Sequence, residues 1–211
     1  MSAISHHVPE NFLAAYAAGS LPHPYALVVA AHISLCLECR AAYEAHLAIG
    51  GAVLASVAEE SVSGDLKLRV LSLLDTPAIP EPAYERANGL PGPVVAALNG
   101  RPPRWRSLGM GIHQCILASG PDGSVRLLYI PPGRAVPDHS HNGAELTLVL
   151  KGSFSDETGR FGAGDLEVAD QTLEHTPIAD PGEPCICLAA TDAPLRFTSL
   201  VPRLLQPFFR I

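Results

Sequence analysis

The chain has 211 residues, of which 47% are hydrophobic and 17% are charged, and its formal net charge is −7. This composition is too apolar and too sparsely charged for a wholly disordered protein. With 14 Lys and Arg against 21 Asp and Glu, the chain also lacks the clustered basic residues that direct binding of nucleic acid requires.

The sequence gives no sign of membrane insertion or export. We find no apolar run of the roughly 18 to 20 residues that a transmembrane helix needs. Residues 1–7 lack the charged and apolar regions of a signal peptide. The five cysteines are odd in number, and two are spaced as metal ligands, which is typical of a reducing compartment. We therefore expect a cytoplasmic protein that does not contact a membrane.

Proline content divides the chain into three segments. Residues 1–76 are rich in Ala and Leu and predict a small all-α domain. Residues 77–103 hold seven prolines and predict a partly extended linker, with a short helix near 94–98. Residues 104–211 consist of short apolar runs separated by Gly, Pro and Asp, a pattern typical of an antiparallel β-barrel. The predicted fold class is therefore α+β multidomain.

Turn and capping signals place the elements within these domains. We expect helices over about 10–18, from Pro24 onward, over 38–60 and over 65–75. Candidate strands are 112–119, 125–130, 145–150, 152–156, 165–168, 175–178 and 185–190.

The helical domain contains a metal-ligand pattern, His32-x3-Cys36-x2-Cys39. Thiolates and imidazoles are the preferred ligands of structural Zn2+, which takes four of them. The three side chains converge on one face of a continuous helix, and they also converge if one helix ends near His32 and the next begins at Cys36. The fourth ligand is open at this point, and the choices are His6, His7, His23 and His46. The alternatives are cysteines packed as small core residues or a redox pair.

This pattern, with a histidine close to the N-terminus, resembles the zinc-binding domain of bacterial anti-sigma factors. The resemblance implies that His6 is the fourth ligand, or His7 if the register differs by one residue.

The barrel domain contains a second pattern, Gly133-x5-His139-x-His141-x3-Glu145-x6-Gly152, which resembles the first cupin motif at each position. Residues i and i+2 of a strand share a face, so His139 and His141 point the same way. His175, on a later strand, would complete a three-His, one-Glu shell for Zn2+ or another divalent transition metal. The proline of the second cupin motif is absent before Gly164, and a barrel that has lost its metal is the alternative.

Three further cysteines lie in the barrel. Cys185 and Cys187 share one face of a predicted strand, where adjacent same-face positions diverge, and we expect both to be packing residues. A redox role for either of them, or for Cys115, is the alternative.

Together the two domains resemble the ChrR class of anti-sigma factors. The resemblance implies inhibition of an extracytoplasmic-function (ECF) type sigma factor in a 1:1 complex. It also implies a cupin-dependent release in response to oxidative stress, in particular singlet oxygen, and no catalytic residues. The residues agree: the helix over 65–75 carries more apolar side chains than a small bundle needs, and residues 1–78 hold seven acids against three bases. The competing hypothesis is a cupin metalloenzyme, such as a dioxygenase or isomerase, with an accessory zinc domain.

Overall fold

The computed structural model describes residues 3–74, 83–136, 139–140, 143–170, 174–192 and 196–197, with the backbone alone for 139–140, 174 and 196–197. Helices come first and antiparallel strands follow, which confirms the predicted fold class. The helices are α1 (Glu10–Ala17), α2 (His23–Ile33), α3 (Leu37–Ser56), α4 (Gly64–Leu74) and α5 (Gly92–Ala97). Each lies within a few residues of its predicted position.

The strands form one large and two small antiparallel sheets. The orders are β1-β2-β3-β11-β5-β8, β10-β6-β7 and β12-β4-β9. The strands are β1 (Arg106–Gly109), β2 (Ile112–Gly120), β3 (Gly123–Ile130), β4 (His139–Ser140), β5 (Glu145–Lys151), β6 (Ser153–Ser155), β7 (Arg160–Gly162), β8 (Leu166–Ala169), β9 (Glu174–His175), β10 (Ile178–Ala179), β11 (Cys185–Thr191) and β12 (Arg196–Phe197).

Two differences from the predicted strands have physical reasons. The predicted strand 175–178 is two strands, β9 and β10, because Pro177 between them has no N–H to donate to a ladder. The strands β1, β4, β7 and β12 were not predicted, since runs of two to four residues are too short to show an alternating pattern.

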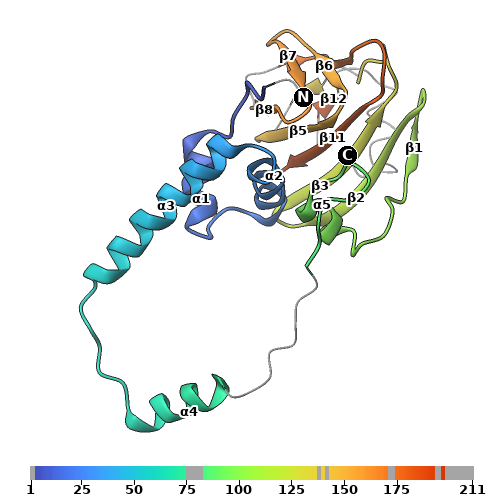
Figure 1. Ribbon diagram of the computed structural model, residues 1–211. Coiled ribbons are helices and arrows are strands. Elements are labelled where there is room, and N and C mark those ends of the chain that lie inside the picture. The colour runs from blue at the N-terminus through green and yellow to red at the C-terminus, as the bar shows by residue number, and fades with distance from the viewer. Residues whose placement is uncertain are drawn as a thin grey trace.

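Helix α2 packs on the large sheet, against β3, β5 and β11 (Figure 1). It is buried almost all round, and Val28 and Val29 are fully inaccessible. The hydroxyl of Tyr25 donates a hydrogen bond to the carbonyl of Ala144, at 2.7 Å. The helices and the barrel therefore share one core, although a proline-rich segment separates them in sequence.

The two faces of strand β5 contribute side chains to two different cores. Leu146 and Leu148 belong to the core shared with α2, whereas Val149, on the opposite face, belongs to a second core inside the barrel. Because side chains alternate along a strand, Glu145 lies on the same face as Val149. Glu145 therefore faces the inside of the barrel.

Helix α4 stands apart from the other helices (Figure 1). None of its residues is buried, and of α3 only Cys39 is. The predicted bundle therefore consists of α1, α2 and the first part of α3 within the described chain.

We find no single described helix that is long and apolar enough to span a membrane. Helices α2 and α3 meet the length and composition requirements together, but the chain bends by 119° between them.

Candidate metal centres

Four side chains near the helix–barrel boundary form a candidate metal site: His7, His32, Cys36 and Cys39. One ligand atom from each lies within 4.8 Å of the others. Nδ1 of His7 is 3.4 Å from Sγ of Cys36 and 3.5 Å from Sγ of Cys39. Two thiols and two imidazoles are the donor set of structural zinc sites.

The turn between α2 and α3 brings three of these residues together. His32 lies in the last turn of α2, and its carbonyl accepts a hydrogen bond from the N–H of Cys36 at 2.8 Å. Cys36 caps α3, and its sulfur accepts the N–H of Cys39 at 3.5 Å. The helix breaks inside the motif, which decides between the two geometries that the spacing allowed.

The surroundings of these side chains fit a metal. His32 is fully buried, and neither ring nitrogen has a hydrogen-bond partner within the described chain. Burial, with His7 nearby, lowers the pKa of His32 to about 4, so the ring is neutral as a ligand must be. The other nitrogen of His7, Nε2, lies 3.5 Å from a carboxylate oxygen of Glu38, as is common for histidine ligands.

His7, and not His6, is the N-terminal histidine in this cluster. The ring of His6 packs on Phe161 with centroids 4.4 Å apart, and its Nδ1 is 3.5 Å from Asp165. The other two choices lie elsewhere, His46 beside Glu10 and His23 at the start of α2. Neighbouring residues of an extended segment point in opposite directions, so only one of His6 and His7 can face the cysteines.

In the barrel, the structure brings together parts of the predicted cupin shell. The backbone of His139 in β4 pairs directly with His175 in β9. Glu145 begins β5, is nearly buried, and accepts a hydrogen bond from the hydroxyl of Thr147 at 2.9 Å. His141 lies outside the described residues.

His175 forms a buried cluster with two carboxylates that belong to neither of the two sequence motifs. Its Nδ1 is 2.8 Å from Asp156 and 3.1 Å from Glu167. Burial favours the neutral ring, but hydrogen bonds from Glu167 and Asp156 and the charges of Glu167 and Glu145 raise the pKa of His175 to about 9. Burial raises the pKa of Glu167 to about 7. The three residues also have ligand atoms within 4.8 Å of one another.

The sequence contains little that would place Asp156 and Glu167 beside His175. Glu167 interrupts an apolar strand. Only the pairing of β8 with β5, which decides which β8 side chains face the barrel interior, shows that Glu167 points inward. Asp156 follows β6 and reaches His175 across 19 residues of sequence. Such contacts depend on strand pairing that no local pattern encodes.

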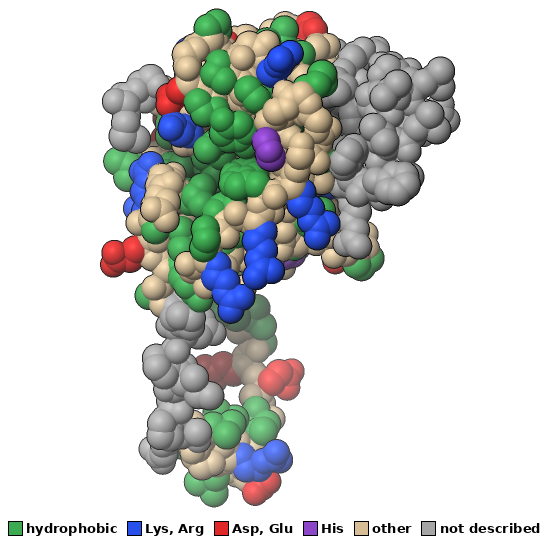
Figure 2. Space-filling view, turned by 90° about the vertical axis from the view of Figure 1, so that its right-hand side faces the viewer, with side chains coloured by type: hydrophobic (Ala, Val, Ile, Leu, Met, Phe, Trp, Pro, Cys, Tyr) green, Lys and Arg blue, Asp and Glu red, His purple; other side chains and the backbone are tan. Residues whose placement is uncertain are grey.

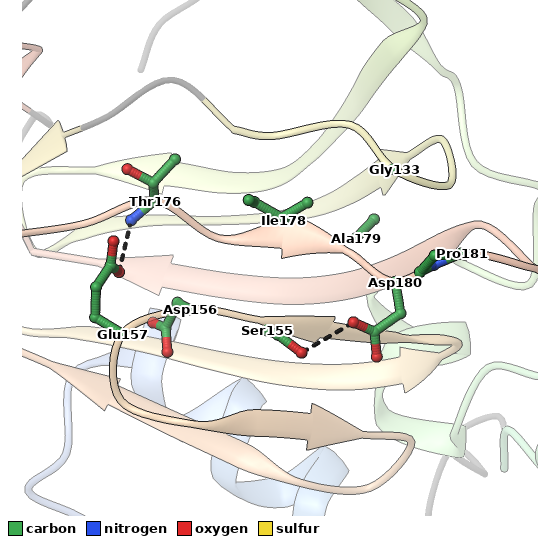
Figure 3. A pocket seen from close by; sticks show the side chains of 9 residues that line it. All are labelled: Gly133, Ser155, Asp156, Glu157, Thr176, Ile178, Ala179, Asp180 and Pro181. Atoms are coloured by element: carbon green, nitrogen blue, oxygen red, sulfur yellow. Dashed lines mark hydrogen bonds between the residues drawn. The ribbon is translucent and has the colours of Figure 1, made fainter.

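A surface pocket of about 460 Å³ opens beside this cluster (Figure 3). Asp156 and Glu157 lie at one end, where Glu157 accepts the N–H of Thr176 at 3.1 Å. Asp180 lies at the other end and accepts the hydroxyl of Ser155 at 2.9 Å. The pocket and the His175 cluster therefore share one residue, Asp156.

The three barrel cysteines are buried. The sulfurs of Cys185 and Cys187 are 3.4 Å apart on β11, closer than we expected from same-face positions of a strand. The contact with Cys185, together with burial, raises the pKa of Cys187. Both pack in the barrel core.

Comparisons with known proteins give a family for this arrangement. A family model described as the ChrR cupin-like domain matches residues 97–194. Anti-sigma-E factor ChrR of Cereibacter sphaeroides is 53% identical over 211 residues, and the match covers 99% of each chain. The chain belongs to the ChrR family of anti-sigma factors.

A solved ChrR structure agrees with this assignment. The crystal structure of Rhodobacter sphaeroides SigE in complex with the anti-sigma ChrR has a TM-score of 0.80 and 50% sequence identity. The match covers 90% of this chain and 99% of that one. Because ChrR proteins are regulators, the family assignment also decides against the metalloenzyme hypothesis.

Proposed function

We propose that this chain binds an ECF-type sigma factor in a 1:1 complex and holds it inactive in the cytoplasm, where transcription takes place. The helical part is the inhibitor. The barrel makes release of the sigma factor dependent on oxidative stress, in particular singlet oxygen. The solved ChrR relative is in complex with SigE, which supports a partner of this class.

The observation that carries the proposal is the apolar surface of α4 and the second half of α3. Leu68, Leu73 and Leu74 of α4 are each 69% exposed or more. Figure 2 shows hydrophobic side chains on α4, which stands below the rest of the molecule in that view. An exposed apolar surface on two helices is costly unless a partner covers it. Residues 1–78 are also acidic, which favours a basic partner such as a protein that binds DNA.

We assign Zn2+ to His7, His32, Cys36 and Cys39 as a structural ion. When bound, it would tie the segment before α1 to the turn between α2 and α3. That turn begins α3, so the ion would fix the direction of the helix that carries part of the apolar surface.

We assign a second divalent transition metal to His139, His141, Glu145 and His175. The pairing of His139 with His175 and the inward parity of Glu145 support this set. Asp156 and Glu167 would then hold the His175 ring through Nδ1, the usual role of carboxylates behind a histidine ligand.

Co-expression with the sigma factor encoded next to this gene tests the inhibitor. We expect co-purification as a 1:1 complex by size exclusion with light scattering, and zinc in that complex by elemental analysis. The Cys36→Ser variant should lose both zinc and the partner, whereas Cys115→Ser, a buried cysteine of the barrel, should keep both. Wild-type chain that elutes alone would contradict the proposal.

A reporter gene driven by the sigma factor tests the sensing role. Glu145→Ala should inhibit like the wild type but fail to release the sigma factor when a photosensitiser generates singlet oxygen. The matched control is Glu183→Ala, an exposed barrel carboxylate beside Lys151, which should respond normally. Normal induction in Glu145→Ala would exclude the proposed role of the barrel metal.

A further inference from the structure

A buried carboxylate of the barrel binds the segment before α1, residues 3–9. Asp165 lies in the turn between β7 and β8 and is only 5% exposed. Its Oδ1 accepts the backbone N–H of Ser5 at 2.7 Å and that of His6 at 2.9 Å. Its Oδ2 accepts the N–H of Gly162 at 2.8 Å, which fixes the carboxylate on its own turn.

Other contacts dock the same segment on the same turn. The carbonyl of His6 accepts the N–H of Leu166 at 3.1 Å, and the His6 ring packs on Phe161. Gly164 lies against Ile4 so closely that a Cβ there would be 2.6 Å from the Ile4 side chain. The segment has no helix or strand of its own, so these contacts and not local structure determine its path.

We propose that Asp165 is a positioning residue for the helical metal site, because it holds the peptide that carries His7. Both hydrogen-bonded N–H groups immediately precede His7, whose Nδ1 faces Cys36 and Cys39. Ordering a free segment costs conformational entropy. Contacts with the barrel order the segment before metal binds, so the barrel contributes to metal retention in the helical domain.

Strand β8 links Asp165 to the barrel cluster. Asp165 directly precedes β8, and Glu167 on β8 contacts His175 of the barrel cluster. One short strand therefore connects the two candidate metal sites. Movement of β8 at the barrel site would alter the support of His7.

Metal release from the full-length chain tests the proposal, which rests on the metal site proposed above. The zinc-loaded protein is mixed with a chelator that changes colour on binding zinc, and the release rate is followed. Asp165→Ala should release zinc from the helical site about 10 to 100 times faster, the range typical of groups that support a metal ligand. Asp165→Asn retains an acceptor for Ser5 and His6 and should fall between Ala and the wild type.

Asp180→Asn is the matched control. Asp180 is another carboxylate that accepts several hydrogen bonds in a barrel turn, but none of them comes from the segment before α1. This variant should lose barrel stability without faster zinc release. Amide hydrogen exchange gives a readout that does not involve metal: exchange of the peptide over residues 4–8 should increase in Asp165→Ala and not in Asp180→Asn.

The outcomes distinguish the two proposals. If Cys36→Ser holds as much zinc as the wild type, the metal site itself is wrong. If Cys36→Ser loses one zinc but Asp165→Ala releases zinc at the wild-type rate, the positioning role of Asp165 is wrong. Equal acceleration in Asp165→Ala and Asp180→Asn would also overturn it, because loss of barrel stability would then be sufficient.

Discussion

At the scale of single residues, the structure separates side chains that the sequence makes equivalent. His6 and His7 are adjacent and chemically identical, yet one packs on Phe161 and the other faces two cysteines. The barrel carboxylates differ similarly: Glu167 is buried beside His175, whereas Asp180 sits in a turn among hydrogen-bond donors. Environment, not residue type, therefore decides which side chain serves a site.

The two N-terminal histidines give a direct prediction. His7→Ala removes one of four candidate ligands and should reduce the zinc content of the purified chain by about one equivalent, or weaken binding at least tenfold. His6→Ala should retain the metal, because its ring contacts Phe161 and Asp165 instead. Elemental analysis and competition with a chelator check this, and the reverse pattern would assign the site to His6.

Asp180 gives a prediction about pH. Burial alone would raise its pKa, but hydrogen bonds from Ser153, Ser155 and Arg160 hold the pKa below its ordinary value of 3.8. A group with a lowered pKa in the folded state stabilises the fold above its unfolded pKa, and this contribution is lost as the pH falls through the folded pKa. Asp180→Asn should therefore lower the melting temperature at pH 6 and progressively less below pH 4. A constant difference between wild type and variant over that range would contradict the assignment.

At the scale of elements, α2 and α4 show opposite uses of apolar residues. Helix α2 is buried between the other helices and the sheet, and its buried residues are apolar apart from His32. Helix α4 has Leu66, Val70 and Leu73 on one face, at i, i+4 and i+7, with nothing in the described chain to cover them. The first helix is part of the core, and the second is the surface that we propose for the partner.

Substitution on α4 should therefore affect binding and not folding. Leu66→Ser should weaken sigma-factor binding at least about tenfold, because anchor residues at interfaces typically contribute about 2 kcal/mol or more and each 1.4 kcal/mol is about tenfold in affinity. The melting temperature of the free chain should stay the same, since Leu66 is already 44% exposed. Lys67→Ser, on the next position of the helix, is the control and should bind normally. Titration calorimetry measures the affinity for the sigma factor, and thermal unfolding measures the melting temperature. A lower melting temperature for Leu66→Ser would show that α4 packs within the chain.

Substitution in the α2 contact should affect folding. Tyr25→Phe removes the hydrogen bond to the carbonyl of Ala144 and should cost about 1 kcal/mol in the free energy of unfolding. Urea denaturation measures the free energy of unfolding and checks this. The slope of that free energy against urea concentration should be the same in variant and wild type. A variant as stable as the wild type would show that the helix is held by apolar contacts alone.

At the scale of the whole molecule, two segments with different sequence patterns share one continuous core, and we expect them to fold as one unit. Leu188 of β11 is fully buried among residues of the sheet and of α2. Leu188→Ala should lower the free energy of unfolding by about 2 to 5 kcal/mol. The helix signal in circular dichroism and the fluorescence of the single tryptophan, Trp105, which precedes β1, should shift together. A shift in the tryptophan signal alone would indicate that helices and barrel fold separately.

The sequence by itself determined the local features of this protein. Helix ends, the longer strands and the spacing of His32, Cys36 and Cys39 follow from periodicity, capping and ligand chemistry, all of which act within a few residues. Only the tertiary structure decided which histidine joins the cysteines, that α2 lies on the sheet, and that Asp156 and Glu167 meet His175. Those outcomes depend on strand pairing and on contacts over more than 100 residues of sequence, such as that of Asp165 with Ser5 and His6. Local preferences carry no information about such contacts, because their energy exists only once the barrel has closed and its turns face the helices.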